Sequence, residues 1–306
     1  MFLIATAVWG FAFVAQKEAT DISAFTIGSV RSIMAAIFLF ALIPFTDRFT
    51  KNGRRLFTEK KTLDINKSEL IGGSILGAIL VTASAFQQIG IEGSDAGKTA
   101  FITALYVVFV PIFSAILGKK PHLNAIISVP IAVLGFYFLC LGPEFSIELS
   151  DLLVLICAVI FAFHIITVDH FSPKCDGVRL SLVQFVVAFV LNTVIALIFE
   201  SPIDISAIGS GFLPLLYLGI MSSGVGYTFQ ILGQKNADPT VSSVLLSLES
   251  VFGVVGGAIM LGEQMTEREY IGCAIVFIAI LISQIDFIEL IKKGNKQERS
   301  QLTFTF

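Results

Sequence analysis

Glu249 is the one acidic residue deep inside an apolar stretch of this sequence. A charged side chain at the centre of a membrane helix costs about 2.5–3.5 kcal/mol on insertion scales, so it usually faces a cavity or a partner. A titratable carboxyl group at this depth is what proton coupling, or binding of a cationic or amino-group substrate, requires. The alternative is a neutral, purely structural Glu249 that is hydrogen-bonded to a neighbouring helix.

Arg31 is the one cation inside an apolar stretch. Its guanidinium could neutralise a substrate carboxylate, pair with Glu249, or extend outward to the membrane surface. At a rise of 1.5 Å per residue, Arg31 lies roughly 10 Å nearer the outer face than Glu249, which disfavours direct pairing. A structural role for Arg31 is therefore slightly favoured.

An internal repeat adds further candidate residues. Phe86-Gln87, Gly90 and Asp95 recur 143 positions later as Phe229-Gln230, Gly233 and Asp238. In the same way, the helical face formed by Thr99, Thr103 and Tyr106 corresponds to Ser242, Leu246 and Glu249. We expect these two polar stripes to face one water-accessible cavity near the middle of the membrane.

Other polar residues could border the same space. Gln87 is expected near the outer end of its stretch and Gln230 near the inner end of its stretch, so the two could flank the two mouths of one pathway. A single Trp more often packs than binds a ligand. His164 could relay protons, although an interhelical hydrogen bond is the favoured reading. The further substrate-binding candidates are Gln16, Tyr227, Ser247 and Trp9.

Ten apolar stretches must position these residues, and each is long enough to span a membrane as a helix. Connections between them are short, so neighbouring helices must pack antiparallel. The predicted spans are Met1–Gln16, Phe25–Phe45, Glu69–Ile91, Asp95–Gly118, Leu123–Leu141, Ser150–Val168, Leu180–Phe199, Gly211–Leu232, Pro239–Gly262 and Arg268–Phe287.

The repeat divides these spans into two copies of five, residues 1–141 and 150–287, followed by a basic tail at 288–306. Because five is odd, the second copy must enter the membrane in the opposite sense. Inverted repeats are typical of alternating-access transporters with a binding site near mid-bilayer. The fold class predicted is therefore an all-α integral membrane protein with ten helices in two inverted five-helix repeats.

The distribution of Lys and Arg predicts the orientation. Of the 20 cations, 16 fall on alternate connections and the tail, including Lys174 and Arg179, and only Lys17, Lys98 and Arg268 fall on the opposite side. An excess of Lys and Arg marks the cytoplasmic side. We expect both termini to be cytoplasmic.

Composition supports a membrane protein and excludes several other classes. Mean hydropathy is +0.88 and only 14% of residues are charged, against roughly 25% in a typical globular protein. A net charge of −3 argues against nucleic acid as a partner. The chain has no P-loop, HExxH or GxSxG motif, and its cysteines show no CxxC spacing. We expect no enzyme activity, no cofactor and no metal site.

The chain resembles the EamA type of the drug/metabolite transporter superfamily. The resemblance rests on Val8-Trp9-Gly10-Phe11 with Lys17, on Arg31, on Thr99–Pro111, and on Leu248–Phe252 with Leu261-Gly262-Glu263. It implies ten helices, a central cavity and metabolite traffic across the inner membrane, commonly export. The family usually has Pro after the Glu of the ninth helix, where this chain has Ser250.

The function predicted is secondary active transport, with export of a small amphipathic metabolite such as an amino acid and protons as a candidate coupling ion. The lipid bilayer is the other expected partner. Two alternatives stay open: an uncoupled facilitative carrier, and a non-transporting scaffold or lipid-handling protein. A polar central cavity open to one face would favour transport, and a dry, fully packed centre would favour the scaffold.

Overall fold

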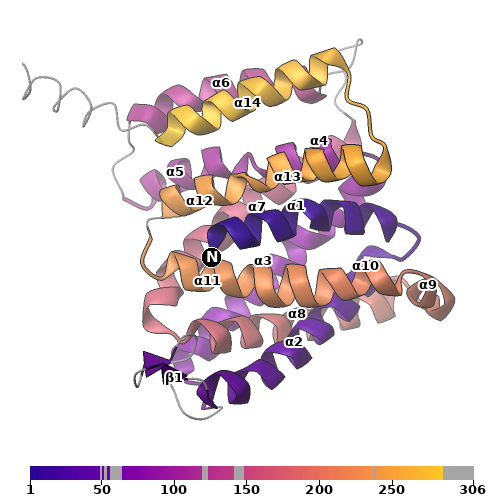
Figure 1. The fold of residues 1–306 in the computed structure, drawn as a ribbon, viewed down its shortest axis with the longest axis vertical. Helices are drawn as coiled ribbons and strands as arrows, with labels where there is room; N and C mark the ends of the chain where they lie inside the picture. Colours follow the sequence, from indigo (N-terminus) through magenta and orange to yellow (C-terminus); the bar gives the residue numbers. More distant parts are fainter. Residues whose placement is uncertain are drawn as a thin grey trace, which may run out of the picture.

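A computed structural model describes residues 1–48, 50–51, 54–55, 64–118, 123–140, 148–237 and 239–284. Its long helices lie side by side, layered from α6 (Leu123–Cys140) and α14 (Glu267–Gln284) to α2 (Ala24–Arg48) at the opposite edge (Figure 1). A hairpin of two short antiparallel strands, β1 (Thr50–Lys51) and β2 (Arg54–Arg55), follows α2. The described chain is otherwise made of helices and their connections.

Seven helical segments are long and apolar enough to cross a membrane, which makes the chain a multi-pass membrane protein. These seven segments are Ala24–Pro44, Lys67–Glu92, Ala96–Ile116, Leu149–Lys174, Gly177–Phe199, Phe212–Gln234 and Pro239–Leu261. The three other predicted spans correspond to α1 (Phe2–Glu18), α6 and α14, with 17, 18 and 18 residues. Ten spans stay a prediction, since a perpendicular crossing needs about 20 residues.

The regular spans include α3 (Lys67–Glu92), α7 (Leu149–Phe171) and α8 (Gly177–Phe199), with the short η1 (Ser172–Lys174) between the last two. The segment Phe212–Gln234 is instead composite: α10 (Phe212–Leu216) leads into the π-helix η2 (Tyr217–Tyr227) and then α11 (Thr228–Gln234). A short helix, α9 (Ile205–Ser210), precedes it. The wider turns of η2 were not predicted.

Two further spans are interrupted near their middles, although the sequence predicted continuous helices. Helix α4 (Ala96–Thr103) gives way to α5 (Tyr106–Ile116), and α12 (Pro239–Ser247) gives way to α13 (Glu249–Gly256), which continues into η3 (Gly257–Leu261). At both breaks the turn is tightened by the same backbone hydrogen bond, between residues three positions apart. The Val108 N–H donates to the Leu105 carbonyl over 2.9 Å, and the Val251 N–H donates to the Leu248 carbonyl over 3.1 Å. Each pair lies three residues apart, and the two pairs are related by the 143-residue offset.

Close helix packing depends on small residues. Helix α3 packs against α7 and α8, α2 against α8, α1 and α4 against α13, and α6 against α14. In α3, Gly73 and Gly77 face Val183, Gln184 and Val187 of α8. A Cβ atom on Gly77 would lie 2.7 Å from the Gln184 carbonyl oxygen. Small residues that let helix backbones approach closely are a main source of helix association in membranes.

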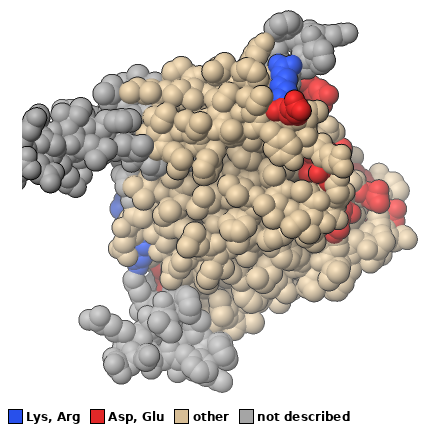
Figure 2. Space-filling model, turned by 45° about the horizontal axis from the view of Figure 1, so that its top comes forward, with Lys and Arg blue, Asp and Glu red and all other residues tan. Residues whose placement is uncertain are grey.

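The two ends of the helix array differ in charge. Acidic side chains gather at the right-hand edge of Figure 2, the end opposite Met1. The described cations at this acidic end are Lys17, Lys98 and Arg268. One assignment was wrong: Arg179 is not a loop residue but is fully buried in the first turn of α8. Its Nη1 lies 3.2 Å from the Asp176 carboxylate, and this ion pair is what permits the burial.

Charged side chains at the acidic end bind free backbone groups at helix ends. The Lys17 ammonium donates to the carbonyls of Ile91, Glu92 and Ser94, where α3 ends, over 2.9, 3.1 and 2.8 Å. The Glu263 carboxylate accepts from the N–H groups of Ala96 and Gly97, where α4 begins. The Lys17 cation lies at the C-terminal end of α3 and the Glu263 anion at the N-terminal end of α4, so each is opposite in sign to the partial charge of the helix end that it contacts. These contacts fix α1, α3, α4 and the connection before α14 to one another.

Gly77→Ala should lower the free energy of unfolding by about 1–3 kcal/mol, because the added methyl group forces α3 away from the backbone of α8. Thermal unfolding in detergent, followed by circular dichroism, would measure the loss. Gly209→Ala in α9 is the matched control, since a Cβ atom there meets no other atom within 4 Å. Equal stability of the two variants would contradict the close α3–α8 contact.

Candidate functional site

A small cavity lined by both polar and apolar side chains lies at the centre of the helix array, where the interrupted spans meet. The predicted residues that line it are Trp9, Gln16, Arg31, Gln87, Thr103, Tyr106, Tyr227, Gln230 and Glu249. Its remaining lining residues are Ala12, Phe13, Phe161, Ile165, Ser222 and Leu246. The space open to water centres measures about 40 Å³, room for roughly three water molecules. In this conformation the cavity is too small for an amino acid.

Three predicted residues lie outside the lining. Thr99 and Ser242 are fully buried, and their hydroxyl groups have no hydrogen-bond partner among the described residues. Ser247 donates to the Val244 carbonyl of its own helix over 2.7 Å. The cavity stops short of Thr99 and Ser242 because the residues one turn nearer its centre, Thr103 and Leu246, form its boundary. The polar stripe therefore reaches the cavity only at its central end.

A chain of amides bounds the cavity toward the acidic end. The Gln16 amide donates to the Gln87 carbonyl oxygen over 3.2 Å, and the Gln87 amide donates to the Thr103 hydroxyl over 3.2 Å. The Gln88 amide donates to the backbone carbonyl of Gln16 over 3.1 Å. This layer joins α1, α3 and α4 next to the contacts made by Lys17. Gln87 and Gln230 both border the cavity itself, and neither lies at a separate mouth.

Glu249 enters the cavity because of the break in its span. It is the first residue of α13, directly after Leu248, and Tyr106 is the first residue of α5 at the equivalent break. The Tyr106 hydroxyl lies beside the Glu249 carboxyl group. The break forms even though the chain has Ser250 in place of the proline usual at this point. The Ser250 hydroxyl donates to the Ser247 carbonyl over 2.8 Å and so satisfies a carbonyl that the break releases.

Arg31 points into the protein and does not extend to the membrane surface. It is only 7% exposed, and its guanidinium donates to two hydroxyl groups of η2. Nε lies 2.9 Å from the Ser223 hydroxyl, and Nη2 lies 3.2 Å from the Ser222 hydroxyl. Neither serine was predicted, since serine is common in membrane helices. The glycine-rich run Gly219–Gly226 was the available signal.

Aromatic rings form the wall beside Arg31. The Trp9 and Tyr227 ring centroids lie 4.7 Å apart, and the Trp9 indole N–H donates to the Ser222 carbonyl over 3.1 Å. Behind Tyr227, the His164 ring packs edge to face with it and has Nε2 3.2 Å from the Gln184 side-chain oxygen. His164 thus makes the interhelical hydrogen bond favoured from the sequence and lies outside the cavity lining.

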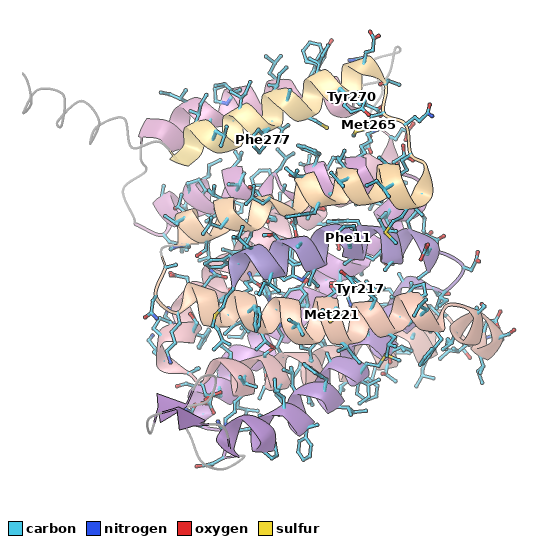
Figure 3. All side chains as sticks on the ribbon, in the orientation of Figure 1. Phe11, Tyr217, Met221, Met265, Tyr270 and Phe277 are labelled. Carbon is cyan, nitrogen blue, oxygen red and sulfur yellow. The ribbon has the colours of Figure 1, made fainter. Side chains whose placement is uncertain are left out.

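A second, larger space lies between α1, η2 and η3. Figure 3 labels three of the residues that line it: Phe11 of α1, and Tyr217 and Met221 of η2. The space measures about 540 Å³, and Glu18 is its one charged lining residue. This apolar groove lacks the convergent polar groups that orient a polar metabolite. The central cavity is therefore the candidate site.

Comparison with known proteins fits this geometry. A family model described as the EamA-like transporter family matches residues 1–141 and 148–284. The chain belongs to the EamA-like transporter family. The family resemblance expected from the sequence is thus confirmed, and this family consists of membrane transporters.

Individual relatives agree with the family. An uncharacterized transporter from Archaeoglobus fulgidus is 29% identical over 278 residues, which cover 90% of this chain and 82% of that protein. An uncharacterized transporter from Haemophilus influenzae is 29% identical over 115 residues, 38% of this chain and 68% of that protein. A solved crystal structure matches with a TM-score of 0.68 at 15% identity, covering 92% of this chain and 95% of the other. That structure shows the fold alone.

The cavity boundary predicts a difference in chemical access. In a variant without native cysteines, Thr103→Cys should react with a small polar thiol reagent markedly faster than Thr99→Cys or Ser242→Cys. Thr103 lines the cavity, whereas the other two hydroxyl groups are sealed one turn away. Labelling rates followed by mass spectrometry would measure the difference. Equal rates at the three positions would mean that the cavity extends along the whole stripe.

Proposed function

We propose that the protein is a secondary active transporter of the inner membrane that exports a small amphipathic metabolite, such as an amino acid. The single observation that carries this proposal is the central cavity, into which one carboxyl group and one guanidinium face from different helices. Ionisable residues inside a membrane protein usually mark a substrate or ion pathway. Glu249 would bind a proton or an amino group. Arg31 lines the same cavity, together with the aromatic side chains of Trp9 and Tyr227.

The proposed architecture is ten spans in two inverted repeats. Its support is the recurrence of the two helix breaks at the 143-residue offset, with matching hydrogen bonds. In addition, α2 packs against α8 and α6 against α14, and the α4–α5 span packs against the α12–α13 span through α4 with α13 and α5 with α12. Each pair joins a span to the one that the repeat makes its equivalent. Such pairing is what a two-fold axis between the halves requires.

Alternating access would open the cavity to each side in turn. The Gln16–Gln87–Thr103 layer closes the side toward the acidic end, together with the Lys17 and Glu263 contacts. Opening that side would require these hydrogen bonds to break. The polar side chains that line the central space support a transporter over a scaffold, for which a dry, fully packed centre is expected.

The proposed orientation places both termini in the cytoplasm, so that the acidic end faces outward. A reporter enzyme active only in the cytoplasm, fused after Phe306, should be active, and one active only outside should be silent. The physical reason is the excess of Lys and Arg on the Met1 side of the membrane. Activity of the external reporter alone would reverse the assignment.

Glu249→Gln tests proton coupling. The amide keeps the shape of the carboxyl group but cannot titrate, so accumulation against a gradient should fall to equilibrium while exchange of substrate continues. The measurement is uptake of labelled metabolites into proteoliposomes with an imposed pH gradient, after a metabolite screen has identified the cargo. Glu92→Gln, an exposed carboxyl group at the end of α3, is the matched control and should accumulate substrate like the wild type.

Equal pH-driven accumulation by Glu249→Gln and the wild type would assign Glu249 a structural role. Transport that never exceeds equilibrium in the wild type would instead identify an uncoupled carrier. No transport of any metabolite in the screen would favour the non-transporting alternatives.

A further inference from the structure

Ser222 and Ser223 are consecutive residues, yet both hydroxyl groups contact one guanidinium. Successive side chains of an α-helix point in directions about 100° apart, and side chains one position apart do not face the same neighbour. The two serines lie within the π-helix η2, whose local geometry departs from that of an α-helix. Single π-turns occur frequently at functional sites. The irregular backbone of η2 thus builds a double hydroxyl contact around Arg31.

The positive charge of Arg31 is not paired with a carboxylate in the described part of the chain. No carboxylate among those residues lies within ion-pair distance of its guanidinium. Hydroxyl groups solvate the cation but do not neutralise it. A guanidinium has five N–H donors, and the serines occupy two of them. Nη1 makes no hydrogen bond to a described residue.

Arg31 borders two spaces, a smaller one between α2, α3 and α8 and the central cavity. Arg31, Ser222 and Trp9 all line the central cavity, and the Trp9 indole N–H donates to the Ser222 carbonyl. The only carboxyl group in the lining is Glu249. An uncompensated buried charge of this kind is costly unless a partner of opposite sign enters. A transported molecule is the partner that can enter.

We propose that Arg31, Ser222 and Ser223 form an anion subsite that binds a carboxylate group of the transported metabolite. A single planar guanidinium matches the two oxygens of a carboxylate, whereas a doubly charged phosphate would call for further cations. Ser222 and Ser223 are positioning residues that hold the guanidinium fork toward the cavity. This inference rests on the proposed transport function, since it names one chemical group of the cargo.

Trp9 offers a direct readout, because it is the only tryptophan of the chain and contacts the Ser222 carbonyl. Purified protein in nanodiscs would be titrated with propionate over the millimolar range at constant ionic strength, with propionamide as the neutral probe of the same size. Propionate should change Trp9 emission saturably, and propionamide should not. An absent response to propionate, or equal responses to both probes, would overturn the subsite.

Variants separate charge from positioning. Arg31→Gln should weaken propionate binding by about tenfold or more, and Ser222→Ala or Ser223→Ala by about three- to tenfold, as expected for lost hydrogen bonds to a charged group. Arg31→Lys keeps the charge and should retain weaker binding. Ser114→Ala, a buried serine of α5 outside the cavity lining, is the matched control. Undiminished binding in a folded Arg31→Gln variant would also refute the proposal.

Failure of the subsite and failure of the transport function give different results. Saturable propionate binding by a protein that moves no metabolite in proteoliposomes would keep the subsite and refute transport. Conversely, accumulation of amines without a carboxylate, at rates equal to those of the matching amino acids, would keep transport and refute the subsite.

Discussion

A peptide group that leaves the helical pattern inside a bilayer must find its hydrogen-bond partner within the protein, because hydrocarbon offers none. This constraint decides where the chain can be irregular. The breaks at Leu105 and Leu248 lie next to residues that line the central cavity, and η2 reaches it through Ser222 and Tyr227, whereas the shorter π-helix η3 lies outside its lining. At the second break, the hydroxyl groups of Ser247 and Ser250 bind backbone carbonyls. At the two breaks and in this part of η2, irregular backbone and cavity therefore occur together for one physical reason.

The same constraint explains how two ionisable residues can be held at this depth. Glu249 lies next to the neutral Tyr106 hydroxyl, and Arg31 donates hydrogen bonds to two neutral serine hydroxyl groups of η2. Neither is locked to the other as an ion pair within the described chain. Such a pair would have been better neutralised, but it would also have left no charge with which to select a ligand. The cavity therefore forms although the charge of Arg31 is not neutralised by a carboxylate of the described chain.

Much of the fold could be predicted because lipid imposes length and polarity on every span. The expected span Glu69–Ile91 lies within two residues of α3 at either end. Arg31 and Glu249 could be singled out because charge is rare in such stretches, and the structure brings both to one cavity. Thr99 and Ser242 could not be excluded, since periodicity describes a helix face but not the depth at which a cavity ends. The role of Ser222 and Ser223 was missed because serine is common in membrane helices, and the glycine-rich run Gly219–Gly226 was the one available signal of an irregular segment.

The π-helix has a further consequence for the energetics of the cycle. In an inverted-repeat transporter with identical halves, the two access states would exchange the roles of the halves and would have equal free energies. Helix α3, the proposed counterpart of the Phe212–Gln234 span, is a regular α-helix from Lys67 to Glu92, whereas its mate contains η2. The halves are thus unequal at the point where Arg31 is held. In the proposed alternating-access cycle, this asymmetry would remove the degeneracy and would give one of the two access states the lower free energy.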